Sequence, residues 1–225
     1  MIIVTGGSSG LGKAIAEDLK ARGENVVTLS RRKESGNDNH VSCDISNYES
    51  LKSAYREFSS SGKEFSALIN CAGIASMNLA LTTPPHMTEK LIKTNLIGTI
   101  FANQIFAPLL IKNKSGRIIN FSTIAVHMAL KGESVYVATK AGIEGFSRVF
   151  ANELSPFNIT VNCIAPGPIR TNLLKGISDE QISKIVDHQI IKKIMTPSSI
   201  TEIVNILLSD QSRNITGEVL NVGGV

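Results

Sequence analysis

A tyrosine and a lysine stand four residues apart, at Tyr136 and Lys140, and this spacing could support proton transfer. Positions i and i+4 of a helix lie on the same face, so the two side chains would be neighbours. A free tyrosine has a pKa of roughly 10 and exchanges protons poorly at neutral pH. A neighbouring ammonium stabilises the phenolate and lowers that pKa. The pair could therefore act as general acid and base on a carbonyl or an alcohol. A surface tyrosine and lysine on an amphipathic helix have the same spacing, so the pair is ambiguous when taken alone.

A glycine-rich turn is the second feature that could do chemistry. Residues 5–12 read Thr-Gly-Gly-Ser-Ser-Gly-Leu-Gly, between an apolar run at 1–4 and a helical pattern over 11–22. A strand, a tight turn and a helix N-terminus place backbone N–H groups and a positive dipole end against a pyrophosphate. Glycines let the backbone approach such a ligand closely. An ordinary glycine turn is the competing interpretation, and the strand–turn–helix context favours dinucleotide binding.

Strands and helices alternate around these two features. Apolar runs predict strands at 1–4, 26–29, 41–45, 67–70, 117–121, 159–164 and 218–222. Helical patterns cover 11–22, 47–61, 86–111, 134–154, 178–193 and 197–208. Parallel strands need crossover connections, and continuous apolar runs indicate strands covered on both faces. We therefore predict an α/β fold over residues 1–225: one doubly wound, Rossmann-like domain with a mostly parallel sheet of about seven strands and helices on both faces.

Five segments, in order along the chain, together resemble the short-chain dehydrogenase/reductase family. They are the Gly-x-x-x-Gly-x-Gly spacing at 6–12, Asn70-Cys71-Ala72-Gly73, Asn95 in a helical segment, Tyr136-x-x-x-Lys140, and Pro166-Gly167-Pro168-Ile169. Segments 116–119 and 215–218 are most similar to the 3-oxoacyl-[acyl-carrier-protein] reductases, although these segments belong to the scaffold. The resemblance implies a nicotinamide dinucleotide cofactor and hydride transfer between it and a carbonyl or secondary alcohol. It also implies a homo-tetramer or homo-dimer built on the helices around 95–110 and 136–154 and on the C-terminal segment.

The resemblance gives each motif residue a role. Tyr136 would be the general acid/base, Lys140 would tune it and bind the nicotinamide ribose, and Asn95 would hold a water. The family's catalytic serine stands thirteen residues before the tyrosine, where this chain has Thr123. Its neighbour Ser122 points to the opposite face of a strand, so we predict that Thr123 holds the substrate oxygen. The predicted cofactor-binding residues are Gly6, Ser8, Ser9, Gly10, Leu11, Gly12, Ser30, Arg31, Arg32, Asp44, Ile45, Asn70, Cys71, Ala72, Gly73, Tyr136, Lys140, Pro166, Gly167, Ile169 and Thr171.

The residues after the second predicted strand favour NADP(H) over NAD(H). An acidic residue at this point usually binds the adenosine ribose hydroxyls, whereas arginine accommodates a 2′-phosphate. The chain has Ser30-Arg31-Arg32 here and no acidic residue until Glu34. Guanidinium groups bind phosphate through forked, charge-assisted hydrogen bonds. A solvated basic turn is the competing interpretation.

Composition narrows the remaining possibilities. The chain has 23 basic and 19 acidic residues, a net charge of +4, and only short basic clusters, so no nucleic-acid partner is expected. Three cysteines without a CxxC pair fit reduced thiols in the cytoplasm, and four scattered histidines predict no metal site. The first residues lack the charged region of a signal peptide. The apolar stretch 96–111 is short and interrupted by polar residues, so no membrane partner is expected.

These patterns predict an NADP(H)-dependent oxidoreductase that interconverts a small-molecule carbonyl and a secondary alcohol. By resemblance, residues 170–195 would form a lid over the substrate; the substrate itself and the direction of the reaction stay open. A non-catalytic dinucleotide-binding regulator of the same fold is the alternative, in which Thr123 would mark lost activity. A sugar-nucleotide epimerase is disfavoured, because that related group is longer and spaces its glycines differently.

Overall fold

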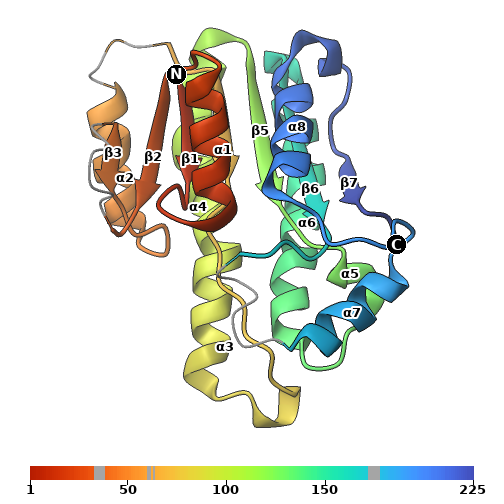
Figure 1. Ribbon diagram of the computed structural model, residues 1–225. Coiled ribbons are helices and arrows are strands. Elements are labelled where there is room, and N and C mark those ends of the chain that lie inside the picture. Colours follow the sequence, from red (N-terminus) through yellow and green to blue (C-terminus); the bar gives the residue numbers. More distant parts are fainter. Residues whose placement is uncertain (33–38, 60–61, 63, 172–177) are drawn as a thin grey trace.

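Seven strands form one sheet in the computed structural model, which describes residues 1–32, 39–59, 62, 64–171 and 178–225. The sheet order is β3-β2-β1-β4-β5-β6-β7, and each neighbouring pair is parallel (Figure 1). The strands are β1 (Ile2–Thr5), β2 (Val26–Ser30), β3 (His40–Ser42), β4 (Ala67–Asn70), β5 (Gly116–Phe121), β6 (Ile159–Pro166) and β7 (Val219–Val222). The predicted α/β fold with a doubly wound parallel sheet is confirmed.

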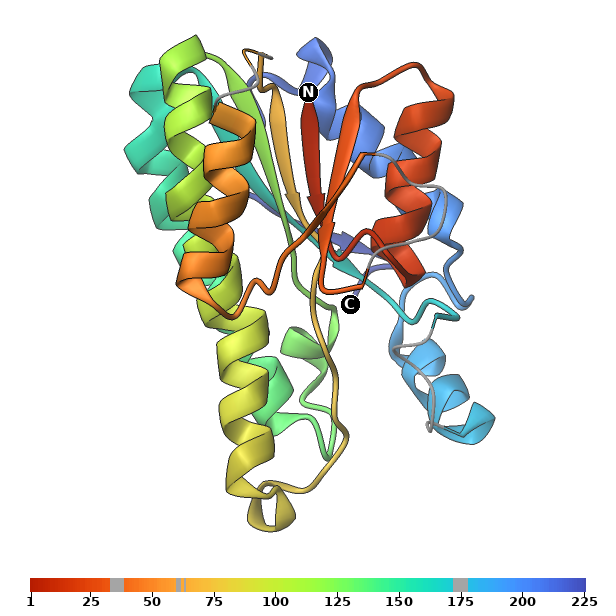
Figure 2. The ribbon, with the colours of Figure 1, turned by 90° about the vertical axis from the view of Figure 1, so that its left-hand side faces the viewer.

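Helices cover both faces of the sheet (Figure 2). One face carries α2 (Tyr48–Ser59), α4 (Gly98–Asn113) and α6 (Ser134–Leu154), and the other carries α1 (Gly10–Ala21) and α8 (Pro197–Leu208). Each face has its own apolar core, with Leu51 and Phe106 in one and Ile15 and Val204 in the other. Because both faces are covered, β1 and β4 are buried along their whole lengths.

A long helical segment reaches beyond the carboxyl ends of the strands. It consists of α3 (Pro85–Leu91), a π-helical turn (Ile92–Ile97) and α4, and it confirms the helix predicted over 86–111 (Figure 1). By length and apolar composition alone, Pro85–Asn113 could cross a membrane. Half of its most apolar window is buried inside the fold, as in the core helix of a globular domain.

The sequence-based prediction is wrong at two boundaries, and in both places side-chain or tertiary contacts turn the chain. The strand predicted over 41–45 ends at Ser42, because the Asp44 carboxylate accepts a hydrogen bond from the Ser46 backbone and bends the chain. The helix predicted over 178–193 is α7 (Asp179–His188). Beyond it the chain is extended, and the Ile191 N–H donates to Gly223 O at 2.8 Å. A short helix that the sequence did not predict, α5 (Ala125–Met128), follows β5.

The strand order places a crevice at the carboxyl ends of the central strands β1 and β4. From β1 the chain moves outward through β2 and β3, and it then returns to build β4 on the other side of β1. Loops that leave the carboxyl ends of β1 and β4 therefore diverge, and ligands of such sheets bind at this switch point.

Candidate active site

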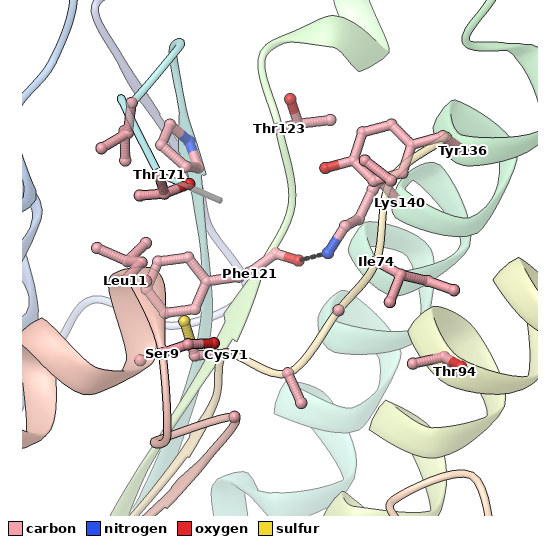
Figure 3. Close-up of a pocket in the computed structure, with 18 of the residues that line it drawn as sticks. Ser9, Leu11, Cys71, Ile74, Thr94, Phe121, Thr123, Tyr136, Lys140 and Thr171 are labelled. Atoms are coloured by element: carbon pink, nitrogen blue, oxygen red, sulfur yellow. Dashed lines mark hydrogen bonds between the residues drawn. The ribbon is translucent and has the colours of Figure 1, made fainter. Parts of the chain in front are cut away.

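A cavity of about 810 Å³ opens at the carboxyl ends of the strands, where the loops after β1 to β6 meet the first turns of α6 (Figure 3). All but two of the predicted site residues line it. They are Gly6, Ser8, Ser9, Gly10, Leu11, Gly12, Ser30, Arg31, Arg32, Asp44, Ile45, Cys71, Ala72, Gly73, Thr123, Tyr136, Lys140, Pro166, Gly167, Ile169 and Thr171. The two exceptions, Asn70 and Asn95, lie behind the wall.

Two glycines of the turn after β1 have no room for a side chain. Gly6 has φ +73°, and a Cβ there would lie 2.7 Å from the Cα of Ala72. A Cβ on Gly12 would lie 2.5 Å from the Gly6 carbonyl oxygen. The turn therefore packs tightly against the β4 loop and the start of α1, and it brings bare backbone to the cavity.

The N-terminus of α1 is suited to a pyrophosphate. Ser9 stands at its N-cap with an extended backbone and makes no side-chain capping hydrogen bond, and the first turn has no acidic residue. The first N–H groups of a helix need an acceptor, and the positive end of the dipole favours an anion. The residues present thus fit the diphosphate of a dinucleotide.

Another part of the cavity carries the basic residues predicted to bind the 2′-phosphate of the cofactor's ribose. Arg31 and Arg32 are exposed and line the cavity, and the Ser30 hydroxyl donates to Arg32 O at 2.8 Å, which shapes the turn. Asp44 lines the same end, with one carboxylate oxygen bound to the Ser46 backbone and hydroxyl.

Tyr136 and Lys140 lie one helical turn apart on α6, as the spacing predicts, and both are almost completely buried. The Lys140 Nζ is 5.8 Å from the centre of the Tyr136 ring and donates to Phe121 O at 2.8 Å (Figure 3). Burial lowers the pKa of Lys140 to about 8.

The pKa of Tyr136 shifts in the direction opposite to the one expected from the sequence. Burial raises this pKa, the negative charge of Glu133 raises it further, and a hydrogen bond with Thr123 lowers it. Burial is the largest of these influences on the pKa of Tyr136, and the Lys140 ammonium donates to the Phe121 carbonyl oxygen. Tyr136 therefore keeps its proton at neutral pH, as a proton donor must.

The neighbours Thr123 and Ser122 face different surroundings. Thr123 lines the cavity beside Tyr136, and its Oγ1 accepts a hydrogen bond from Ala125 N at 3.3 Å. The Ser122 hydroxyl donates to the buried carboxylate of Glu144 on α6 instead. Both residues line the cavity, and the choice of Thr123 over Ser122 as the residue that holds the substrate oxygen stays a prediction.

Asn95 and Asn70 support the wall from behind. In the π-helical turn, Asn95 Oδ1 accepts from Ile74 N and Asn95 Nδ2 donates to Ile74 O, both at 2.9 Å. Asn70 Nδ2 donates to Asn120 Oδ1 at 2.8 Å inside the sheet. The first residue anchors the loop after β4, and the second links β4 to β5. The water-holding role of Asn95 stays a prediction.

One part of the cavity is lined by residues that the sequence analysis missed. These are chiefly apolar and come from loops, the π-helical turn and α7: Ile74, Thr94, Ile124, Leu130, Glu133 and Ile185. Apolar loop residues have no motif of their own. Glu133 was detectable in principle, because it lies one helical turn before Tyr136.

Metal and thiol chemistry find no support at this site. In the described part of the chain, no three His, Cys, Asp or Glu side chains lie close enough to hold a metal ion. Cys71 lines the cavity as a free thiol, and burial raises its pKa to about 12, which makes it a poor nucleophile.

Comparison with known proteins places the chain among oxidoreductases. A family model described as Enoyl-(Acyl carrier protein) reductase matches residues 6–224. Carbonyl reductase family member 4 of Xenopus tropicalis is 33% identical over 98% of this chain and 95% of its own length. The 3-oxoacyl-[acyl-carrier-protein] reductase FabG of Escherichia coli (strain K12) is 31% identical over 99% of this chain and 95% of its own length.

A solved structure agrees with these relatives in fold. The ligand-free aldohexose dehydrogenase (AldT) of Thermoplasma acidophilum superposes with a TM-score of 0.89 at 28% identity, covering 99% of this chain and 92% of the other. The family model, the relatives and the shared fold all span nearly the whole chain. The chain therefore belongs to the short-chain dehydrogenase/reductase family and is an NAD(P)-dependent oxidoreductase of carbonyl and alcohol groups.

Proposed function

We propose that this protein is an NADP(H)-dependent carbonyl reductase in which Tyr136 is the general acid. The observation that carries the proposal is the buried Tyr136, which lines the same cavity as Thr123, Lys140 and the glycine turn. Because burial keeps Tyr136 protonated, this residue can donate a proton to a carbonyl oxygen during reduction.

The residues at the far end of the cavity support NADP(H) as the cofactor. Arg31 and Arg32 would bind the 2′-phosphate, the N-terminus of α1 the pyrophosphate, and Asp44 and Ile45 the adenine. When bound, the cofactor supplies the hydride. Lys140 would bind the nicotinamide ribose.

The chain's own residues would move the proton. Thr123 would hold the substrate oxygen by a hydrogen bond, and Tyr136 would donate its proton to that oxygen as the alcohol forms. A charged Lys140 beside them would stabilise the tyrosinate left behind. Asn95 would keep the β4 loop in place through its two bonds to Ile74.

We further propose a single domain over 1–225 whose substrate lid lies within 170–195, of which residues 172–177 lie outside the described part of the chain. Ile185 on α7 lines the cavity, as a lid residue should. A homo-dimer or homo-tetramer is proposed from the outer face of α6, where Ala138, Ala141, Gly145 and Val149 are exposed. The free thiols Cys43, Cys71 and Cys163 support a cytoplasmic location.

The test is to follow NADPH absorbance with a panel of ketones, with NADH in parallel. Steady oxidation of NADPH, faster than that of NADH, is expected. Tyr136→Phe should lower turnover by about 10²- to 10⁴-fold, the usual contribution of a general acid. Tyr48→Phe, at an exposed ring on α2, is the control. Full activity of Tyr136→Phe would contradict the mechanism, and tight NADPH binding without turnover of any ketone would favour the regulator.

A further inference from the structure

Glu133 stands where a substrate would meet it. It immediately precedes α6, one helical turn before Tyr136, and it lines the cavity. Its negative charge reaches the Tyr136 hydroxyl strongly enough to raise the pKa of that group. A substrate whose carbonyl oxygen is held by Tyr136 therefore places its neighbouring atoms within the field of Glu133.

The other charged side chains of the cavity wall are either hydrogen-bonded or lie in other loops than Glu133. Among the described lining residues they are Arg31, Arg32, Asp44 and Lys140. The first three surround the turns after β2 and β3, and Lys140 donates to the Phe121 carbonyl. Within the described part of the chain, the Glu133 carboxylate makes no hydrogen bond or ion pair.

Apolar side chains make up most of the wall on the substrate side. Ile74, Ile124, Leu130 and Ile185 line the cavity there, together with the hydroxyl of Thr94, and Ile74 and Thr94 lie on the Tyr136 side of the close-up (Figure 3). Burial raises the pKa of Glu133, which means that its charge is poorly solvated in this setting. A partly buried carboxylate without partners gains from a ligand that brings a hydrogen-bond donor or a positive charge.

We propose that Glu133 selects the substrate: it favours carbonyl compounds that carry a hydroxyl or an amine near the carbonyl, and it disfavours those that carry a carboxylate there. The inference rests on the proposed carbonyl reductase activity and names the substrate class of the same cavity. Glu133 would contact the substrate and act mainly on its binding. Substitutions at Glu133 should therefore change KM more than kcat.

Three methyl ketones of equal length test the charge preference. 4-(Dimethylamino)butan-2-one is cationic, 4-hydroxybutan-2-one is neutral, and 4-oxopentanoate is anionic, each with two methylenes between the carbonyl and the variable group. For the wild type, kcat/KM should fall in that order. The cation should exceed the anion by roughly tenfold or more, as expected for charges a few ångströms apart in a partly shielded site.

Substitutions at Glu133 separate its role from that of the rest of the site. Glu133→Gln should bring the three values of kcat/KM together, mainly through KM, and Glu133→Lys should reverse the order. Glu153→Gln removes an equal charge from the exposed far end of α6 and should leave the order unchanged. Melting temperatures of all variants show whether each one is folded.

The outcomes distinguish the two proposals. Turnover of the three ketones with no charge order in the wild type, or with the same order in Glu133→Gln, would overturn the role of Glu133 and leave the reductase intact. No turnover of any carbonyl compound by the wild type would contradict the proposed function itself.

Discussion

At the scale of single residues, Lys140 is a buried lysine whose surroundings disfavour its charged form. Its Nζ is buried and donates to the Phe121 carbonyl oxygen, and its pKa falls from 10.5 to about 8. Between these two values the unfolded chain binds more protons than the folded one, so stability rises with pH across this window. At neutral pH the buried ammonium costs folding free energy, on the order of 3 kcal/mol for a shift of this size.

Lys140→Met should therefore abolish turnover while leaving the free energy of unfolding in urea unchanged or higher. In the wild type, kcat/KM for carbonyl reduction should fall as pH rises through about 8, since the ammonium is lost there. A urea midpoint well below that of the wild type, or a flat pH profile from 7 to 9, would contradict this account. Lys52→Met, at a half-buried lysine on α2 far from the cavity lining, is the control.

Substitutions at Thr123 and at Ser122 should have different effects, the first on catalysis and the second on stability. Thr123→Ala removes the hydroxyl proposed to hold the substrate oxygen and should lower kcat about 10²- to 10³-fold, the usual cost of losing one hydrogen-bond donor to a developing oxyanion. Thr123→Ser should keep most of the activity. Ser122→Ala removes the partner of Glu144, so it should lower the melting temperature more than kcat. Equal activity of Thr123→Ala and the wild type would exclude the predicted role.

At the scale of elements, the turn between β1 and α1 requires glycine because a side chain would clash with neighbouring backbone. Gly6 and Gly23 both have positive φ, +73° and +86°. A Cβ on Gly6 would meet the Ala72 backbone at 2.7 Å, whereas one on Gly23 would have nothing within 4 Å. A substitution at Gly23 therefore measures the cost of the left-handed backbone alone, whereas one at Gly6 adds the cost of the clash with Ala72.

Gly23→Ala should lower the free energy of unfolding by about 1 kcal/mol, the cost of a left-handed conformation alone. Gly6→Ala should lower it by clearly more and should also weaken NADPH binding, because the turn must move away from Ala72. Urea unfolding and NADPH fluorescence titration measure the two effects. Equal losses for the two variants would show that the contact with Ala72 is unimportant.

The boundaries of helices and strands show which of them the local sequence pattern predicts correctly. The helix predicted over 134–154 and the strand predicted over 67–70 match α6 and β4, because periodicity and apolar content decide both. The helix predicted to 193 stops at His188, where buried Gln189 and the contact with Gly223 pull the chain away. Such a contact joins residues far apart in sequence, so no local pattern could reveal it.

At the scale of the whole molecule, the outer face of α6 is the surface on which the proposed oligomer rests. Gly145 is exposed, and a Cβ there would have nothing within 4 Å, while Val149 is 60% exposed. Gly145→Arg should thus fold normally as a single chain and should disrupt packing between copies.

Sedimentation velocity should show a dimer or tetramer for the wild type and a shift to monomer for Gly145→Arg, with an unchanged circular dichroism spectrum. Asn152→Arg, at the exposed end of the same helix, adds the same single charge and is the control. A wild type that is monomeric at micromolar concentration would exclude the oligomer. An unchanged oligomer in Gly145→Arg would place the interface elsewhere.

The sequence by itself determined the order of strands and helices, the glycine turn and the Tyr136–Lys140 neighbourhood, because each depends on residues close together in the chain. Tertiary structure alone decided the rest. It turned Lys140 toward Phe121, raised the pKa of Tyr136, and placed Asn95 behind the cavity wall. It also placed Glu133 in the cavity wall, one helical turn before Tyr136. Burial and charge depend on segments that meet only when the sheet has formed, and those segments set the protonation state of the tyrosine.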